Sequence, residues 1–376
     1  MMRLLFCIFQ IFIIFIACNR SNQDLESYTD DIYRPSYSKS FSITGKDNSE
    51  NSLIKVINPW QGAENIETSL LIIRDEEKPV NFEGQVIKGK ADRIICMSST
   101  HIAMLDAIDD IDKIVGVSGM QYITNKEIRR NENKIPDVGY EGNIDYEAIL
   151  AAKPDLILLY SVNGFSSMEP KLKELGIPFI YIGDYLEENP LGKAEWIVAI
   201  AEIMGKREDG IKKFEEISKK YDNLRQLVVY NNLEKPKVMV NLPFGDAWFM
   251  PSTQSYVAKL IEDAGGEYIY KKNTGTSSLP IDLEEAFQLT SKTDYWLNLN
   301  NLNSIDELKS EVPKFSETRV VKEGKVYNNN YRCSSGGGND CFETGVINPD
   351  LILRDLIKIF HPELINEDFV YYHKLK

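Results

Sequence analysis

The sequence predicts an α/β protein with two doubly wound α/β lobes, joined by a long helix and preceded by an N-terminal β extension. Short apolar strands alternate with helices over residues 91–189, and this alternation returns over residues 233–376. Between the two stretches, residues 190–232 have helical periodicity and no strand signal. Because strands that alternate with helices form parallel sheets covered on both faces, each stretch is expected to form one lobe.

The first lobe is expected to begin with an apolar strand at residues 93–97. A helix at residues 100–108 follows, with Ser99 as a possible N-cap. The remaining elements of this lobe are strands at 113–117, 156–159 and 179–182 and helices at 145–152 and 169–175. Gly176 is expected to end the last helix, since glycine readily adopts the left-handed conformation found there.

The connector between the lobes is predicted to be helical. Trp196, Ile200 and Ile203 lie on one helical face. After Gly205 a second apolar stripe runs through Ile211, Phe214, Ile217, Tyr221 and Leu224. A helical segment of this length suits a bridge between two lobes better than a link within one sheet.

The second lobe contains an echo of the first. Residues 144–149 precede residues 153–158 as a capped helix, a short turn and a buried strand. Residues 281–286 and 292–297 repeat this pattern with two more residues in the helix and turn. The repeat supports two related lobes. The other elements expected here are strands at 237–241 and 325–327 and helices at 255–264 and 349–360.

The N-terminus has the order of an export signal. A positive charge at Arg3 precedes an apolar run at residues 4–16, and Ala17 precedes Cys18. The run is shorter than the ~20 residues that span a bilayer. It resembles a bacterial lipobox with Phe15 in place of the usual leucine, which implies a signal peptide over 1–17 and lipidation of Cys18. The alternative is an ordinary signal peptide with an incidental cysteine.

The segments that follow are expected to be a flexible tether at residues 18–46 and a β extension at 47–90. The tether is rich in Ser, Asp, Asn and Tyr and has no sustained period. The formal net charge of −14 argues against nucleic acid as a partner, because an acidic surface repels phosphates. Cys96 lies in an apolar strand pattern and is expected to be a buried thiol. Cys333 and Cys341 either form a disulfide or remain thiols.

From about residue 92 onward the chain resembles the substrate-binding proteins of ABC importers for siderophores, haem and cobalamin. The resemblance is carried by residues 93–101, 112–117, 147–159, 172–182 and 328–349. The glycine run 336–338, followed by Asn339 and Asp340, is similar to a lipoprotein branch common in Bacteroidetes-type bacteria and usually assigned to iron-chelate uptake. In one departure, Ser98 to His101 stand where many relatives have Pro-Ser before Thr-Glu, so no role of that glutamate is carried over.

The resemblance implies a monomeric binding protein, not an enzyme, in the periplasm and anchored by lipid to the inner or outer membrane. Its partners would be a metal chelate and an ABC permease dimer in the inner membrane. Glu147 and Glu284 occupy matching positions in the two copies of the repeated pattern. The resemblance also implies that they dock into arginines of the permease. Otherwise each is a solvated glutamate in a first helical turn, favoured by the helix dipole.

The ligand is expected between the lobes, near the carboxyl ends of the strands. This placement selects two sets of residues. The first lobe supplies Ser98, Ser99, Thr100, His101, Tyr140, Ser161 and Asn163, and the second supplies Phe244, Trp248, Tyr331 and Arg332. Aromatic faces suit a large chelate, and Arg332 suits an anionic group. Core packing for Phe244 and Trp248, a surface ion pair for Arg332 and a capping turn for His101 are the alternatives.

An iron-siderophore is the expected ligand, with cobalamin, another corrinoid or haem as alternatives. Three scattered histidines argue against a site for bare Zn or Mn, and no cofactor is expected. The sequence has no Gly-x-Ser-x-Gly or His-Glu-x-x-His motif, and the glycine run lacks the Lys-Ser/Thr pair of a Walker loop. Asp340 and Glu343 either position this loop or touch the ligand. Two other classes are the alternatives: an enzyme, such as a chelatase or hydrolase that acts on a nutrient, and a surface interaction protein that uses the fold only as a scaffold.

Overall fold

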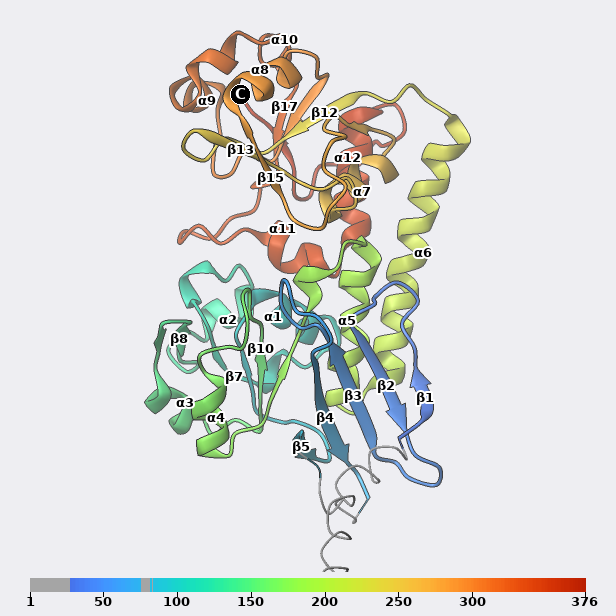
Figure 1. The fold of residues 1–376 in the computed structure, drawn as a ribbon, viewed down its shortest axis with the longest axis vertical. Coiled ribbons are helices and arrows are strands. Elements are labelled where there is room, and N and C mark those ends of the chain that lie inside the picture. The colour runs from blue at the N-terminus through green and yellow to red at the C-terminus, as the bar shows by residue number, and fades with distance from the viewer. Residues whose placement is uncertain (1–27, 76–81, 83) are drawn as a thin grey trace, which may run out of the picture.

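The computed structural model describes residues 28–75, 82 and 84–376. It is an α/β structure with two lobes stacked along its long axis and α6 running beside both of them (Figure 1). The predicted fold class is therefore confirmed. The predicted signal peptide at 1–17, Cys18 and the first part of the predicted tether lie outside the described residues.

The N-terminal lobe is built on a four-stranded sheet in the order β11-β10-β6-β7, with every pair parallel. The residues of β10 are all buried, as expected for a strand with both faces covered. The strands are β6 (Ile94–Cys96), β7 (Ile114–Val117), β10 (Leu156–Leu159) and β11 (Phe179–Tyr181). Its helices are α1 (Ser99–Ala107), α2 (Lys126–Arg130), α3 (Tyr146–Ala152) and α4 (Glu169–Leu175).

The C-terminal lobe has a five-stranded sheet in the order β14-β12-β16-β17-β18, in which only the β17–β18 pair is antiparallel. Its strands are β12 (Lys237–Val240), β14 (Glu267–Tyr268), β16 (Tyr295–Leu297), β17 (Val326–Asn328) and β18 (His373–Lys374). A separate antiparallel pair joins β13 (Ala247–Met250) to β15 (Leu279–Asp282). The helices are α7 (Tyr256–Asp263), α8 (Leu283–Thr290), α9 (Ile305–Glu311), α10 (Arg319–Lys322), α11 (Asp340–Glu343) and α12 (Pro349–Phe360).

The predicted linking helix is divided into α5 (Pro190–Ile203) and α6 (Arg207–Asn231), with a turn at Gly205 between them. Every residue of α5 except Lys193 is buried, so α5 belongs to the interior. The 25 residues of α6 extend over about 37 Å. This helix packs against α5 in one lobe and against α12 in the other, so α6 is the helix that bridges the lobes.

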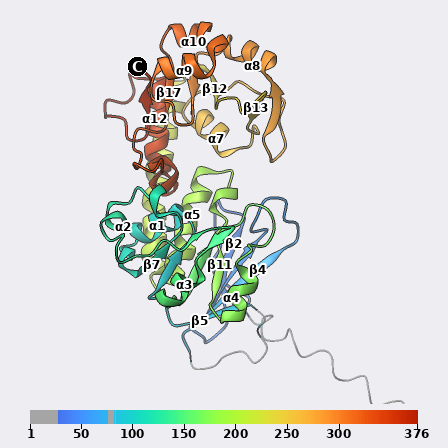
Figure 2. The same ribbon diagram turned by 90° about the vertical axis from the view of Figure 1, so that its left-hand side faces the viewer.

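The N-terminal extension is a five-stranded sheet in sequence order. Its strands are β1 (Asp30–Tyr33), β2 (Phe41–Gly45), β3 (Ser52–Ile57), β4 (Glu67–Ile73) and β5 (Gln85–Lys88). The prediction of a flexible tether was therefore wrong for residues 30–45. The reason is the alternation in β2, where Phe41 and Ile43 enter the core while Ser42 and Thr44 on the other face are only partly buried. In Figure 2, β4 lies beside β11, so the extension stands next to the sheet of the N-terminal lobe.

Buried carboxylates on α5 hold this extension in place. Glu195, with no exposed surface, accepts hydrogen bonds from the backbone N–H groups of Ser36, Tyr37 and Ser38 at 2.7–2.8 Å and from the Tyr33 hydroxyl at 2.8 Å. In the last turn of α5, Glu202 pairs with Arg74 of the extension at 2.9 Å. These contacts make the extension a fixed part of the N-terminal lobe.

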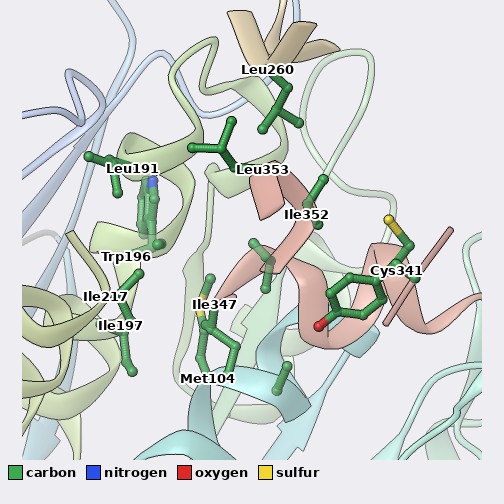
Figure 3. Packing of buried hydrophobic residues seen from close by; sticks show 14 of the residues in the cluster. Met104, Leu191, Trp196, Ile197, Ile217, Leu260, Cys341, Ile347, Ile352 and Leu353 are labelled. Atoms are coloured by element: carbon green, nitrogen blue, oxygen red, sulfur yellow. The ribbon is translucent and has the colours of Figure 1, made fainter. Parts of the chain in front are cut away.

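The two lobes share one apolar core. Figure 3 shows Met104 of α1 and Trp196 and Ile197 of α5 gathered with Ile347, Ile352 and Leu353, which belong to the C-terminal lobe. Cys341 of α11 and Leu260 of α7 lie in the same cluster. Apolar packing across the junction therefore holds the lobes against each other alongside α6.

Candidate ligand-binding cleft

A cleft of about 620 Å³ lies between the lobes and draws its walls from both. This volume falls within the range of roughly 300–1,000 Å³ that is usual for small-molecule sites. The N-terminal lobe contributes Ser98, Ser99, Thr100, Tyr160, Val162, Asp184, Tyr185 and Lys193, and the C-terminal lobe contributes Ser255, Tyr256, Val257, Leu260, Asn298, Asn329, Cys341, Phe342, Val346, Ile352 and Tyr372.

Strand ends position most of the polar wall. Ser98 follows β6 and caps α1, its Oγ accepting a hydrogen bond from the Thr100 N–H at 3.3 Å. Ser98, rather than the predicted Ser99, is thus the N-cap. Asn298 follows β16 with φ of +62°, a left-handed conformation that asparagine tolerates well. Its Oδ1 accepts a hydrogen bond from the Tyr372 hydroxyl at 2.8 Å, which fixes both side chains at the cleft wall.

Aromatic rings and hydroxyl groups dominate the character of the cleft. Burial raises the pKa of Tyr256 and of Tyr372 well above the ordinary tyrosine value, so both phenols are neutral donors at physiological pH. Burial also raises the pKa of Tyr185, whose hydroxyl donates to the Ser161 carbonyl at 2.6 Å. Such a surface can stack on and hydrogen-bond to an organic ligand without placing many charges around it.

Asp184 and Lys193 are the acidic and the basic side chain among the described residues that line the cleft. Burial raises the pKa of Asp184 and lowers the pKa of Lys193, because each charged form is poorly hydrated there. The Asp184 Oδ1 accepts a hydrogen bond from the Thr100 hydroxyl at 3.4 Å. The Lys193 Nζ lies 5.1 Å from the centre of the Tyr256 ring, which belongs to the opposite lobe.

The β3–β4 connection reaches the edge of the cleft from the N-terminal extension. The backbone N–H of Gln61 donates to the Val162 carbonyl and to the Tyr185 hydroxyl, both at 3.2 Å. The Gln61 side chain then donates to Ser277 of the C-terminal lobe at 3.1 Å. The extension therefore braces two residues of the cleft wall and touches both lobes.

On another part of the junction, α11 and the glycine run join the lobes directly. The Glu343 carboxylate accepts hydrogen bonds from the backbone N–H groups of Thr124 and Asn125, both at 2.7 Å. Gly338 approaches the Tyr122 backbone so closely that a Cβ atom would lie 1.6 Å from the Tyr122 oxygen. The glycine run is therefore needed for contact between the lobes, and Glu343 positions this loop and does not line the cleft.

The stability of the protein should depend on pH through Glu343. Burial raises the pKa of this carboxyl group to about 7 from the ordinary 4.5, although the two backbone donors oppose the shift. The folded state thus favours the protonated form, whose contribution to stability is complete below about pH 4.5 and is lost as the pH rises through 7. We expect Glu343→Gln, which mimics the protonated form, to unfold with a smaller decrease in Tm between pH 5 and 8 than the wild type.

Thermal unfolding followed by circular dichroism across this pH range measures the difference. Glu317→Gln, at an exposed ion pair with Lys322, is the control, and its Tm should change with pH as steeply as that of the wild type. Equal slopes for Glu343→Gln and the wild type would show that Glu343 does not titrate differently in the folded and unfolded states.

Three of the predicted ligand residues, Ser98, Ser99 and Thr100, line the cleft. His101 follows them in α1, but its ring is fully buried, and within the described residues neither ring nitrogen has a hydrogen bond of good geometry. Burial lowers the pKa of His101 to about 3, so the ring is neutral. The residue lies outside the cleft lining because helical geometry turns the next side chain after Thr100 into the core.

The remaining predicted residues of the first lobe lie elsewhere. Ser161 is buried, and its hydroxyl donates to the Gly164 carbonyl at 2.6 Å, which holds the turn after β10. Tyr140 is exposed and lines a different hollow, together with Glu147. Asn163 is exposed beyond the cleft lining. In this part of the lobe it is Tyr160 and Val162, the neighbours of Ser161, that face the cleft.

The predicted residues of the second lobe also lie outside the cleft. Trp248 is fully buried, donates to the Val240 carbonyl at 2.9 Å and packs against Trp296 and Phe315, as expected for a core residue. Phe244 is 81% exposed at a turn. Tyr331 is exposed near the His373 ring, and Arg332 pairs with Asp340 at 3.4 Å.

Of the two alternatives for Cys333 and Cys341, a disulfide or free thiols, the structure has the thiols. Within the described part of the chain, both are free thiols, as is Cys96. Cys333 is exposed, and its backbone forms an isolated antiparallel β-bridge with Asn339. Cys341 lies in α11 at the junction between the lobes (Figure 3). The short sequence separation could not reveal that the two side chains face different surroundings.

Some residues of the cleft could have been found from the sequence. Asn298 and Asn329 directly follow strands, so the rule that ligands bind at the carboxyl ends of strands applies to both. Lys193 and Tyr256 lie in the first turns of α5 and α7, and nothing in the local pattern separates them from ordinary helical residues. Their role depends on how the two lobes face each other.

Glu147 and Glu284 occupy equivalent positions in the two lobes. Each is the second residue of its helix, after an aspartate N-cap: Asp145 accepts from the Ala148 N–H at 2.9 Å, and Asp282 accepts from the Glu285 N–H at 2.8 Å. Both glutamates are exposed, and Glu284 is 3.4 Å from Lys314. In Figure 1, α3 and α8 both lie on the side of the molecule away from α6.

No group of three or more His, Cys, Asp or Glu side chains in residues 28–75, 82 and 84–376 is arranged to hold a metal ion. In the same ranges, no helix combines the length and the apolar character needed to cross a membrane.

Known proteins resemble this chain in sequence and in fold. Over 355 residues it is 28% identical to an uncharacterized lipoprotein of Methanocaldococcus jannaschii, a match that covers 87% of this chain and 81% of that protein. A periplasmic heme-binding protein from Pseudomonas aeruginosa superposes with a TM-score of 0.59 at 14% identity, covering 76% of this chain and 98% of that one. A possible iron-binding (periplasmic solute-binding) protein from Staphylococcus epidermidis gives a TM-score of 0.58 at 16% identity, covering 73% and 100%.

The sequence profile of the periplasmic binding protein family matches residues 94–330, which include the N-terminal lobe, the bridging helix and the C-terminal lobe as far as β17. The β extension precedes this match. With its two lobes, its bridging helix and a cleft between them, the chain belongs to the periplasmic binding protein family.

Proposed function

We propose that this protein is the substrate-binding component of an ABC importer, which captures a metal chelate and delivers it to an inner-membrane permease. The observation that carries the proposal is the cleft of about 620 Å³ whose walls come from both lobes at the carboxyl ends of their strands. A binding protein, rather than an enzyme, fits a wall of rings, hydroxyls and amides. The resemblance to periplasmic binding proteins supports the same conclusion.

The chemistry of the wall favours an organic chelate, and we propose an iron-siderophore as its ligand. Tyr160, Tyr185, Tyr256 and Tyr372 provide ring faces and phenol groups for a ligand that is large and partly aromatic. Among the described residues that line the cleft there is no histidine, so haem would need a tyrosine or cysteine as its axial ligand. Solved structures of similar fold include heme-binding proteins, and haem and corrinoids are therefore tested beside siderophores.

The ligand class can be tested with the purified protein. Isothermal titration with a ferric hydroxamate, a ferric catecholate, haemin and cyanocobalamin is expected to give a Kd at or below about 1 μM for at least one chelate. Ser99→Trp, which places an indole in the cleft, should abolish this binding, whereas Ser310→Trp on the exposed face of α9 should not. Recovery of the bound chelate unaltered, by mass spectrometry, separates binding from catalysis. If no chelate binds, or if Ser99→Trp binds as well as the wild type, the proposal is wrong.

The proposal also covers the oligomeric state, the location and the protein partner. We propose a monomer in the periplasm, lipid-anchored to the cell membrane through Cys18 and docked on the permease through Glu147 and Glu284. The exposure of both glutamates and their matching positions in α3 and α8 support the docking role, because one carboxylate from each lobe can meet one subunit of a permease dimer.

A further inference from the structure

We propose that Asp184 and Lys193 form a subsite in the cleft that binds an amide group of the ligand, with the carboxylate accepting from the amide N–H and the ammonium donating to the amide carbonyl. This inference rests on the proposed function and narrows its ligand to chelates that carry amide groups. It favours amide-bearing siderophores and corrinoids over haem.

The Asp184 carboxylate has unused hydrogen-bonding capacity. Asp184 begins the 3₁₀ turn after β11, lines the cleft and is only 2% exposed. Its Oδ1 accepts the long hydrogen bond from Thr100, while its Oδ2 has no hydrogen-bond partner anywhere in the described residues. A buried carboxylate oxygen without a donor is unfavourable, so a ligand N–H that reached it would be bound with a gain in free energy.

The Lys193 ammonium is also uncommitted. Its side chain is partly exposed, while the other residues of α5 are buried, and within the described ranges no ion pair of 4.0 Å or less joins its Nζ to a carboxylate. The carboxylates whose charges act on it are those of Asp184 and Glu187, and the latter already accepts hydrogen bonds from Ser38 and Trp196. Because the lysine stem is flexible, its ammonium can leave the Tyr256 ring for a ligand oxygen.

An amide matches this pair of groups better than a charged ligand does. The pair combines one acid and one base, so its net charge is close to zero whether both are ionised or both are neutral. An amide carries both a hydrogen-bond donor and an acceptor and adds no charge. A carboxylate, such as a haem propionate, could pair with Lys193 but would meet repulsion from Asp184, and an ammonium group would meet the reverse. The subsite therefore selects by repulsion as well as by attraction.

Three chelates and two variants test the subsite. The probes are ferrioxamine E, a neutral ferric trihydroxamate whose ring carries amides, cyanocobalamin, which carries amide side chains, and haemin, which carries carboxylates. We expect the wild type to bind an amide-bearing probe more tightly than haemin. Asp184→Asn should weaken that binding by about tenfold or more, because a hydrogen bond to a charged group is lost. For haemin the same variant should bind at least as tightly as the wild type.

Lys193→Met is the second variant, chosen because this partly exposed side chain can be changed without opening the core. It should weaken the amide-bearing probe and haemin alike, since both are proposed to place an oxygen on the ammonium. Asp350→Asn, a buried aspartate in the first turn of α12 outside the cleft lining, is the matched control and should leave each Kd unchanged. Circular dichroism confirms that each variant is folded.

The outcomes separate the two proposals. A wild type that binds an amide-bearing probe, with Lys193→Met and folded Asp184→Asn within twofold of it, would overturn the subsite and leave the proposed function standing. A wild type that prefers haemin to both amide-bearing probes would also overturn the subsite alone. Wild-type protein that binds no chelate of any class would overturn the proposed function together with the inference.

Discussion

Reversing the charge of both Glu147 and Glu284 to lysine should abolish uptake of the ligand by cells while the affinity of the purified protein for the ligand stays unchanged. Each glutamate is exposed in a first helical turn, and each is held there by an aspartate N-cap that the substitution leaves intact. If arginines of the permease receive these carboxylates, lysines would face like charges, which costs several kcal/mol at an interface. Neither residue lines the cleft between the lobes, so the ligand site is preserved.

Uptake of a radiolabelled ferric chelate by cells that carry the importer, together with titration of purified protein, measures both effects. The matched control reverses Glu208 in the first turn of α6 and Glu311 at the end of α9, two exposed glutamates outside α3 and α8. This control should transport normally. Normal uptake by the Glu147→Lys, Glu284→Lys double variant would rule out the docking role.

Replacing Glu195 by alanine should lower the free energy of unfolding by about 2 kcal/mol or more, since a buried donor left without a partner costs roughly 1–3 kcal/mol and a partly buried donor costs less. The substitution removes the acceptor of three backbone N–H groups, those of Ser36, Tyr37 and Ser38, and of the Tyr33 hydroxyl. The Tyr33 hydroxyl comes from the end of β1, and the three N–H groups lie between β1 and β2, where the chain meets α5. Their release would detach the first strands of the extension from the lobe.

Urea unfolding gives the change in free energy, and limited proteolysis locates it. Cleavage should begin near residues 33–40 in Glu195→Ala and not in the wild type. Glu195→Gln keeps one oxygen acceptor and should lose less stability, whereas Glu208→Ala, exposed on α6, should lose almost none. If Glu195→Ala and the wild type have the same midpoint of urea unfolding, these hydrogen bonds do not hold the extension.

The α/β fold could be predicted from the sequence because its signals are local. The apolar run of β10 and the helix caps at Asp145 and Asp282 depend on neighbouring residues alone, and the structure has them. Ser98, Ser99 and Thr100 were found for the same reason, because they directly follow a strand whose direction is fixed by the alternation of strands and helices.

The remaining parts of the site depend on contacts between distant segments. Tryptophan and phenylalanine side chains are equally common in ligand sites and in cores. The packing of Trp248 on Trp296 and Phe315 identifies it as a core residue, and this packing cannot be read from the local sequence. Residues 30–45 are polar enough to suggest a tether, yet Glu195 in α5, far along the chain, supplies the acceptors that order them. Lys193 faces the cleft because its helix enters the junction at that turn.

The apolar junction between the lobes has a consequence for how cargo could leave. Swinging the halves apart would bring Met104, Ile347 and Leu353 into contact with water, at a cost of about 25 cal/mol for each Å² of newly wetted hydrocarbon. Wide separation of the two lobes is therefore unfavourable. In the proposed importer, release of the ligand therefore depends on the permease. The permease would bind both lobes and use the free energy of ATP to separate them.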